Sequence, residues 1–521
     1  MSPSQRRRDE VTLAAAPAEG VPHRVLITIC VMMATVMQTL DSTIANVALP
    51  YMQGSLAASQ EEISWVLTSY IVATAIMTAP SGYLARRFGR TRFFVICTLG
   101  FTCSSILCGT AQSLDQIVVY RVLQGGFSAS LVPLSQSTML DVWPVEQRGT
   151  ATAIWMMGAL IGPILGPTLG GWLTENYNWR WVFYINVPFA TLSTLGIIAF
   201  LKETTRVKDA RLDWTGFLAL SLGVGALQTM LDRGETLDWF ASGEIRVEAV
   251  LSGLGFYIFL TQSALAPKPF LTPRLFKDLN FLSAIMIMFT LGLILFATMA
   301  LLAPYLEQLL NYPVASAGLI MAPRGAGALL AAPICGRLVQ RINRRFIVGF
   351  GLIATICSLY VMISWTPDVS EWSIASTGFV LGLSSSCLTV PVATIAFATL
   401  PVELRSEGAG VFSLFRNLGS SIGIAVTVAL LEVNTQVNHA IIGAAVTPFN
   451  RILQNGAPLH FWNPGTPQGA AALNAVITRQ SSIIAYANDF KLLLFFAIAA
   501  LPLVLLIRNP SPMLAGGAAA E

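Results

Sequence analysis

Long apolar runs, bounded by charged or turn-forming residues, recur along almost the whole chain. A helix needs roughly 20 apolar residues to cross the hydrocarbon core of a bilayer. Fourteen runs approach or exceed this length, so the pattern predicts fourteen transmembrane helices. They cover residues 25–49, 62–85, 93–111, 116–140, 150–173, 182–201, 214–231, 247–266, 280–306, 314–338, 346–364, 373–398, 408–431 and 489–507.

Composition supports an integral membrane protein. Of the 521 residues, 54% are hydrophobic and only 11% are charged, whereas a soluble protein carries roughly 25% charged residues. All seven cysteines lie inside the apolar runs, without the spacing of metal ligands or of a disulfide framework. We therefore expect an all-α membrane fold with no metal, no cofactor and no nucleic-acid partner.

The positive charges are distributed unevenly between the loops. Most of the 31 Lys and Arg residues fall in alternate loops, above all in 86–92, 202–211, 268–277 and 337–345. Loops rich in Lys and Arg stay in the cytoplasm. With an even number of spans, this distribution predicts that both termini are cytoplasmic.

The second half of the chain repeats features of the first. The phrase "PVEQR" (144–148) returns as "PVELR" (401–405), and "GYLARRFGR" (82–90) returns as "GRLVQRINR" (336–344). Spans 1–6 and 9–14 therefore form two copies of one six-helix unit. The predicted parts are residues 1–201, inserted helices 7 and 8 in residues 202–278, and residues 279–521 with an outer loop at 432–488. Such repeats are typical of secondary transporters, with the substrate site between the two copies.

Five motifs, in this order, resemble those of a known family. They are "LDSTIANVALP" (40–50), "GYLARRFGR" (82–90), "RVLQGG" (121–126), "GPILGPTLGG" (162–171) and "LDRGETLDWF" (231–240). Together they resemble the fourteen-helix drug:proton antiporter branch, EmrB type, of the major facilitator superfamily. One position departs from the superfamily pattern, because Arg86 stands where an aspartate is usual.

The resemblance implies a fold and a function. It implies the major facilitator fold and a proton-coupled exporter of hydrophobic toxic compounds in a bacterial inner (cytoplasmic) membrane. It also implies a periplasmic membrane-fusion adaptor protein and an outer-membrane channel as partners. Two alternatives stay open: a dedicated exporter of one endogenous metabolite or lipid-like compound, and a transporter-derived membrane sensor. No phosphate-binding loop or nucleophile–base set is visible, so neither ATP drive nor an enzyme is expected.

Asp41 and Arg121 are the main candidates for chemistry. Each lies inside an apolar span, in its outer half. A charge placed there costs about 2.5–3.5 kcal/mol on insertion scales, so it usually has a function. We expect Asp41 to bind the coupling proton and Arg121 to contact it directly or through water. The alternatives are a structural ion pair, and an Arg121 that bonds only backbone carbonyls.

Three further groups of residues are candidates. The substrate cavity candidates are Asn46, Gln124, Trp155, Met156, Phe412 and Arg416. The cytoplasmic gate motif comprises Gly82, Arg86, Arg87, Gly89 and Arg90, although topology alone would explain its charge. The antiporter motif comprises Gly162, Pro163, Gly166, Pro167, Gly170 and Gly171, although tight helix packing would explain its glycines. In the second half, Glu307 and Asp489 are expected near the outer surface, in water.

Overall fold

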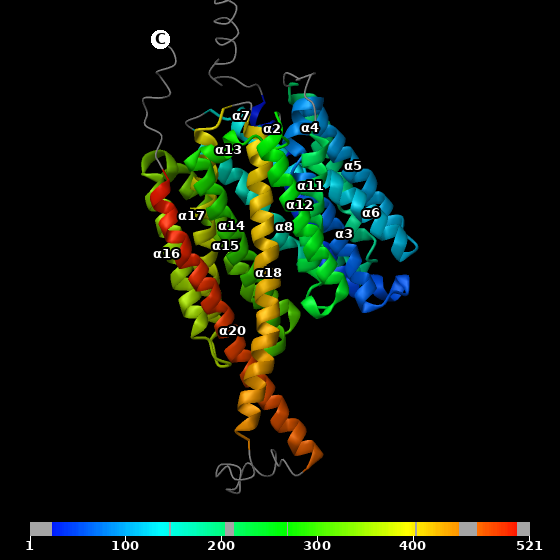
Figure 1. The fold of residues 1–521 in the computed structure, drawn as a ribbon, viewed down its shortest axis with the longest axis vertical. Helices are drawn as coiled ribbons and strands as arrows, with labels where there is room; N and C mark the ends of the chain where they lie inside the picture. The colour runs from blue at the N-terminus through cyan, green and yellow to red at the C-terminus, as the bar shows by residue number, and fades with distance from the viewer. Residues whose placement is uncertain are drawn as a thin grey trace, which may run out of the picture.

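A computed structural model describes residues 23–144, 147–203, 213–267, 269–401, 404–446 and 466–507, and these ranges contain helices but no strand. Each predicted span lies on a helix or on two consecutive helices (Figure 1). Twelve of the described helices are long and apolar enough to cross a membrane, or thirteen with one bent pair. The chain is therefore a multi-pass membrane protein, and the count of fourteen stays a prediction.

The first half consists of short and long helices. They are α2 (Arg24–Leu56), α3 (Gln60–Thr78), α4 (Ser81–Phe88), α5 (Arg90–Thr110), α6 (Leu114–Ser128), α7 (Leu131–Val142), α8 (Arg148–Asn176), α9 (Trp181–Tyr184) and α10 (Asn186–Phe200). Three predicted spans are each divided between two helices: 62–85 between α3 and α4, 116–140 between α6 and α7, and 182–201 between α9 and α10. The span 62–85 bends by 59° between α3 and α4, where Pro80 interrupts the helical hydrogen bonding.

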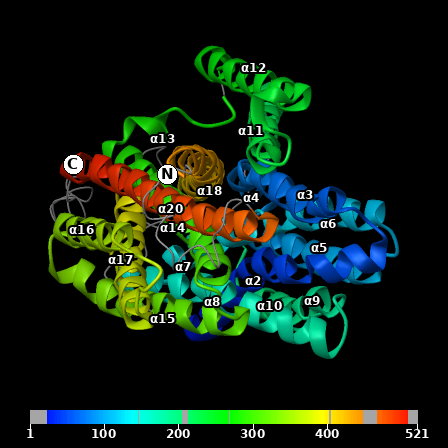
Figure 2. The same ribbon diagram turned by 90° about the horizontal axis from the view of Figure 1, so that it is seen from below.

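Two helices, α11 and α12, precede the second half of the chain. The elements are α11 (Trp214–Arg233), the 3-10 turn η2 (Trp239–Ala241), α12 (Gly243–Leu265), α13 (Arg274–Lys277), α14 (Leu279–Pro304), the π-helix η3 (Tyr305–Leu309), α15 (Val314–Arg341), α16 (Arg344–Ile363), α17 (Glu371–Ala398), α18 (Arg405–Ala444) and α20 (Pro467–Leu506). Helices α11 and α12 lie at the side of the molecule (Figure 2). They pack closely where Gly255 meets the backbone of Gly223.

Helix starts are fixed by polar side chains that bond the free backbone N–H groups of the first turn. Ser59 and Glu62 form a reciprocal capping box at the start of α3. Single caps begin seven other helices: Ser113 for α6, Asp213 for α11, Ser242 for α12, Asp278 for α14, Asn343 for α16, Ser370 for α17 and Thr466 for α20. Five of these helices begin within three residues of the predicted start, α12 begins four residues before it, and α20 begins far before it.

The predicted outer loop at 432–488 is wrong for most of its length. Helices α18 and α20 have 40 residues each, and both continue beyond the body of the molecule as a protruding pair (Figure 1). His439 Nε2 lies 2.9 Å from Asn474 Oδ1 across this pair. The segment contains good helix formers, so polarity ended the predicted spans without ending the helices. Residues 447–465, including His460, lie outside the described residues.

The repeated glycines occupy equivalent places in the two halves. A Cβ atom at Gly162 or Gly166 would overlap α2, the first helix of the first half. A Cβ atom at Gly419 or Gly423 would overlap α14, the first helix of the second half. The same close approach of two helices is therefore built twice.

This packing predicts opposite outcomes for two glycines of the antiporter motif. A Cβ atom at Gly162 would collide with the backbone nitrogen of Leu40, which cannot rotate away. At Gly171 the nearest atom is Val47 Cγ1 at 3.8 Å, an ordinary contact. We expect Gly162→Ala to destabilise the protein by about 1–3 kcal/mol and Gly171→Ala to leave stability unchanged. Thermal unfolding in detergent measures both, and equal melting temperatures would contradict the packing.

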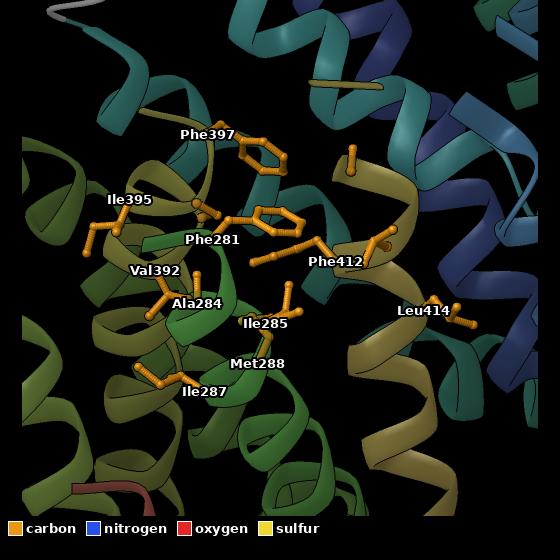
Figure 3. Packing of buried hydrophobic residues seen from close by; sticks show 14 of the residues in the cluster. Phe281, Ala284, Ile285, Ile287, Met288, Val392, Ile395, Phe397, Phe412 and Leu414 are labelled. Carbon is orange, nitrogen blue, oxygen red and sulfur yellow. The ribbon is translucent and has the colours of Figure 1, made fainter. Parts of the chain in front are cut away.

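An apolar cluster joins α14, α17 and α18 (Figure 3). Phe412 lies in it with its ring 5.6 Å from that of Phe397, and Phe281 packs beside them. Ala79 and Leu140 of the first half belong to the same cluster. This packing connects the two halves at the end of the molecule that carries Arg86, Arg344 and Arg405, which we call the arginine-rich end.

Candidate functional site

Asp41 and Arg121 form a buried ion pair between α2 and α6. Arg121 Nη1 donates to Asp41 Oδ2 over 2.8 Å. The side chains are 0% and 1% exposed, so water does not screen the pair. Arg121 Nε also donates to the carbonyl oxygen of Val66 on α3, over 3.0 Å. The sequence predicted a contact either directly or through water, and the structure has the direct form, with one guanidinium nitrogen on the carboxylate.

Two amides hold the other carboxylate oxygen. Asp41 Oδ1 accepts from Gln124 Nε2 over 3.0 Å and from Asn186 Nδ2 over 2.8 Å. Both amides also donate to Ser105 Oγ, over 3.2 and 3.1 Å. Gln124, predicted as a cavity residue, thus belongs to the Asp41 site. Its Oε1 accepts from Arg121 Nη1 over 2.7 Å, which closes a ring of hydrogen bonds.

Aromatic rings cover the guanidinium. Arg121 Cζ lies 4.0 Å from the centre of the Tyr70 ring and 5.7 Å from that of Phe183. Such contacts stabilise a desolvated cation by about 2 kcal/mol. Arg121 therefore keeps several favourable contacts that do not depend on the charge of Asp41.

This arrangement can hold or release one proton. An ionised Asp41 is stabilised by one cation and two amide donors, which offsets the cost of burying it. A protonated Asp41 would lose the attraction of Arg121, while Arg121 keeps Val66, Gln124 and the two rings. The site therefore has two plausible bonding arrangements that differ by one proton and by the link between α2 and α6.

The gate motif contacts the second half at the arginine-rich end. Arg86 on α4 lies 3.0 Å from Glu407 on α18. Glu407 is 3% exposed and also accepts from the backbone nitrogen and hydroxyl of Thr272, over 2.6 and 3.2 Å. The basic residue at the usual aspartate position thus has a carboxylate partner on the opposite half.

A second ionic bridge lies beside the first. Asp141 on α7 contacts Arg90 of its own half and lies 3.6 Å from Arg405 of the other half. Next to it the backbones of Gly149 and Gly336 touch, because a Cβ atom on either would meet the carbonyl of the other. The two halves are therefore closed together at this end.

The remaining motif residues take varied positions. Gly82 is buried in α4, Gly89 turns the chain at a φ of 89°, and Arg87 is exposed. Gly170 would bring a Cβ atom to 2.9 Å from the carbonyl of Ile44. The side chains of Pro163 and Pro167 lie outside the described residues.

The predicted cavity residues do not gather in one place. Trp155 and Met156 are buried in an apolar cluster that contains residues of both halves, and Trp155 Nε1 donates to Ser135 Oγ over 2.9 Å. Phe412 is buried in the cluster that joins the halves. Asn46 is exposed and Arg416 is half-buried. In this state these aromatic and Met side chains are packed in buried apolar clusters.

Comparison with known proteins gives the family. The family model described as Major Facilitator Superfamily matches residues 31–424. The chain belongs to this superfamily. Multidrug export protein EmrB of Escherichia coli (strain K12) is 35% identical over 436 residues, which cover 83% of this chain and 85% of that protein. Fatty acid resistance protein FarB of Neisseria gonorrhoeae is 32% identical, covering 94% of this chain and 97% of that protein.

A solved structure supports the same fold. The proton:xylose symporter XylE superposes with a TM-score of 0.59 at 12% identity, covering 92% of this chain and 95% of that one. Members of the superfamily are transporters, a different class from enzymes. The similarity to multidrug export proteins supports a drug-exporter function for this superfamily member.

Two residues of the Asp41 site were not predicted from the sequence of this superfamily member. Asn186 and Ser105 are both fully buried and both lie within apolar spans. A buried amide needs hydrogen-bond partners, so an Asn inside a span is itself a signal. That signal gives no partner, because the partners come from α2 and α5, far away in the sequence.

The geometry predicts that Arg121→Lys weakens coupling in this superfamily member. A lysine has one nitrogen, so it cannot bond Val66 and Asp41 in the same way, and it lacks the flat face that lies over Tyr70. We expect proton-driven export to fall by about tenfold while the protein still folds, since each lost charge-assisted hydrogen bond is worth about 1.5–3 kcal/mol. Transport in vesicles at equal protein content measures this, and unchanged export would exclude a role for this geometry.

Proposed function

We propose that this chain is a drug:proton antiporter that exports hydrophobic toxic compounds across a bacterial inner membrane. The observation that carries this proposal is the buried pair of Asp41 and Arg121, held by Gln124 and Asn186. A carboxylate with this environment can exchange a proton when the helices around it move. The arginine-rich end faces the cytoplasm in this proposal, and both termini lie on that side.

The closed arginine-rich end supports a cycle of alternating access. Ion pairs and the Gly149–Gly336 contact join the halves on the proposed cytoplasmic side. Separation of these contacts would open the space between the halves to the cytoplasm. Protonation of Asp41 weakens its link to Arg121 and so favours one arrangement of the first half over the other.

The protruding helices support an assembly with an adaptor. The outer parts of α18 and α20 form a helical pair on the proposed periplasmic side (Figure 1). A paired helical surface is suited to contact further helices of a partner. We propose a periplasmic membrane-fusion adaptor and, through it, an outer-membrane channel as the partners. The predicted domain boundaries, with residues 202–278 as an insertion, are part of the same proposal.

Proteoliposomes test the function. The purified chain is reconstituted, a pH gradient is imposed, and the accumulation of several chemically different hydrophobic compounds is followed. Accumulation that disappears when an ionophore collapses the gradient supports the antiporter. Downhill flux without gradient-driven accumulation would contradict proton coupling, and no flux at all would favour a membrane sensor.

Two arginines favour a second candidate, an exporter of a lipid-like organic anion. Within the described residues, Arg324 Nη2 donates to the carbonyl of Leu295 over 2.7 Å and to Thr298 Oγ1 over 3.0 Å, but its Nη1 has no partner. Over the same residues, Arg416 reaches only Asn417 Oδ1, at 3.5 Å, and its Nε has no partner. In the described part of the chain neither arginine contacts a carboxylate. The name of the relative FarB, a fatty acid resistance protein, fits an anionic amphiphile.

This candidate predicts a charge-selective effect of Arg416→Gln. Loss of one charge-assisted contact, about 1.5–3 kcal/mol, should weaken transport of a fatty acid about tenfold or more. Transport of an uncharged compound of similar size should not change. Arg246→Gln, on the exposed face of α12, is the matched control. Equal loss for both compounds would exclude an anion site at Arg416.

A further inference from the structure

A second buried carboxylate lies in the second half of the chain. Asp489 was expected in water at a helix end, but α20 begins about six turns earlier. Asp489 is only 1% exposed. Within the described residues Asp489 Oδ2 has no hydrogen-bond partner, and no cation pairs with this carboxyl group.

The surroundings of Asp489 are aromatic and apolar. Tyr486, one turn earlier on α20, packs at 5.1 Å against Tyr305 of η3. Trp365 lies 5.7 Å from Tyr305 and 6.0 Å from Phe490, which follows Asp489 directly. The carboxyl group therefore lies next to a cluster of four aromatic rings between α20, η3 and the end of α16.

No charged group of the neighbouring helices compensates Asp489. Helix α14 carries no titratable side chain. The other titratable groups on α20 and the elements packed against it are Arg479, Tyr486 and Lys491 on α20, Tyr305 and Glu307 on η3, Arg344, Arg345, Cys357 and Tyr360 on α16, and Arg405, Glu407, Arg416, Glu432 and His439 on α18. Among the described residues, none of these forms an ion pair or hydrogen bond with Asp489. A bare carboxylate is strongly disfavoured in such a place, whereas a protonated carboxyl group is not.

A water-accessible cavity lies one helical turn away. It has a volume of about 760 Å³ and lies between η3, α18 and α20, with Tyr486 and Pro304 in its wall. Glu235 and Glu432 also line it. Burial, followed by the charge of Glu432, raises the pKa of Glu235. The cavity thus carries a group that takes up protons more readily than an ordinary glutamate does.

We propose that Asp489 is a second proton-binding site, loaded from this cavity past Tyr486. Tyr305 belongs to a π-helix, a form that is frequent at functional sites of longer helices. In this proposal η3 rearranges, so that Tyr305 leaves Tyr486 and Asp489 is connected with the cavity. The proposal rests on the proposed antiporter function and adds a second proton to its cycle.

Carbodiimide labelling tests the site itself. Dicyclohexylcarbodiimide reacts with protonated carboxyl groups in apolar places: the O–H adds across a C=N bond, and the product rearranges to a stable N-acylurea. The full chain in nanodiscs is treated at a series of pH values, and labelled residues are identified by mass spectrometry. We expect a label on Asp489 that decreases as the pH rises. No label at any pH, or the same label at every pH, would overturn the proposal.

Transport stoichiometry tests its role. The number of protons exchanged per substrate is obtained from the voltage and pH gradient that just stop net flux. Asp489→Asn, a neutral isostere, should fold normally and exchange one proton fewer per substrate while still responding to the pH gradient. Asp115→Asn, in the exposed first turn of α6 and outside the cavity wall, should keep the native number.

The possible failures are distinguishable. An unchanged proton number in Asp489→Asn overturns the second site and leaves the antiporter intact. A native chain without gradient-driven transport overturns the proposed function, whereas labelling of Asp489 would still report on the site.

Discussion

Vesicles that contain Asp41→Asn are expected to lose uphill export driven by a pH gradient. An amide has the shape of the carboxylate but cannot exchange a proton, so substrate movement is no longer tied to proton movement. Couplings of this kind are worth about 1–3 kcal/mol, which corresponds to a loss of about 5- to 150-fold in the accumulation ratio. Exchange of labelled for unlabelled substrate without a gradient should persist, because it needs binding and rocking but no coupling.

Two controls separate this effect from misfolding. Asp115→Asn removes a carboxylate in the exposed first turn of α6 and should change nothing. Asp41→Asn leaves Arg121 buried without its partner, which costs about 3–5 kcal/mol of stability. The double variant Asp41→Asn with Arg121→Gln removes both charges, so its thermal stability should recover while uphill export stays absent. Recovery of uphill export in this double variant would refute the role of Asp41.

Reversal of the charge at Arg86 is expected to open the arginine-rich end. Arg86→Glu places a second carboxylate next to the buried Glu407, which changes attraction into repulsion across the two halves. We expect export to fall about tenfold. Arg86 is partly exposed, so solvent screens its charge and limits the loss of export. Maleimide should also modify Thr150→Cys faster, because Thr150 lies at the contact with Gln340 of the second half.

Restoration of the ion pair is the stronger test of whether Arg86 and Glu407 hold the two halves together. Arg86→Glu combined with Glu407→Arg rebuilds an ion pair with inverted polarity, so export should return to within about threefold of the native value. Full recovery is not expected, because Glu407 also accepts two hydrogen bonds from Thr272 that arginine cannot accept. Lys277→Glu, the same charge change at an exposed position of α13, should have little effect. Equal damage from Lys277→Glu and Arg86→Glu would indicate topology, and not a specific contact between the halves.

Features of the site that depend on the position of residues within single spans could be predicted from the sequence. The depth of Asp41 and Arg121 within their spans predicted a pair, and the glycines of α8 predicted a close helix contact. The partners Asn186 and Ser105 could not be predicted, because hydrogen bonds between distant helices follow from how the helices pack. For the same reason no partner of Arg86 could be predicted, although Glu407 is next to the repeated phrase.

In the second half, a prediction based on the polarity of a segment was wrong. The outer part of α20 is polar, so hydropathy placed the start of the span at Asp489 and the carboxyl group in water. In the structure the helix begins earlier and packs against η3 and α18, which buries Asp489. Hydropathy reports where a helix meets lipid, whereas the burial of one side chain depends on its neighbours. Phe412, predicted to line a cavity, is likewise buried between helices in this state.

Substrate binding as a function of pH tests the central claim most directly. If a proton on Asp41 competes with the substrate, affinity measured in nanodiscs should rise with pH in the native chain, because binding releases the proton. Asp41→Asn has no proton to release at this site, so its affinity should rise less steeply with pH. The same pH dependence in both chains would contradict the account.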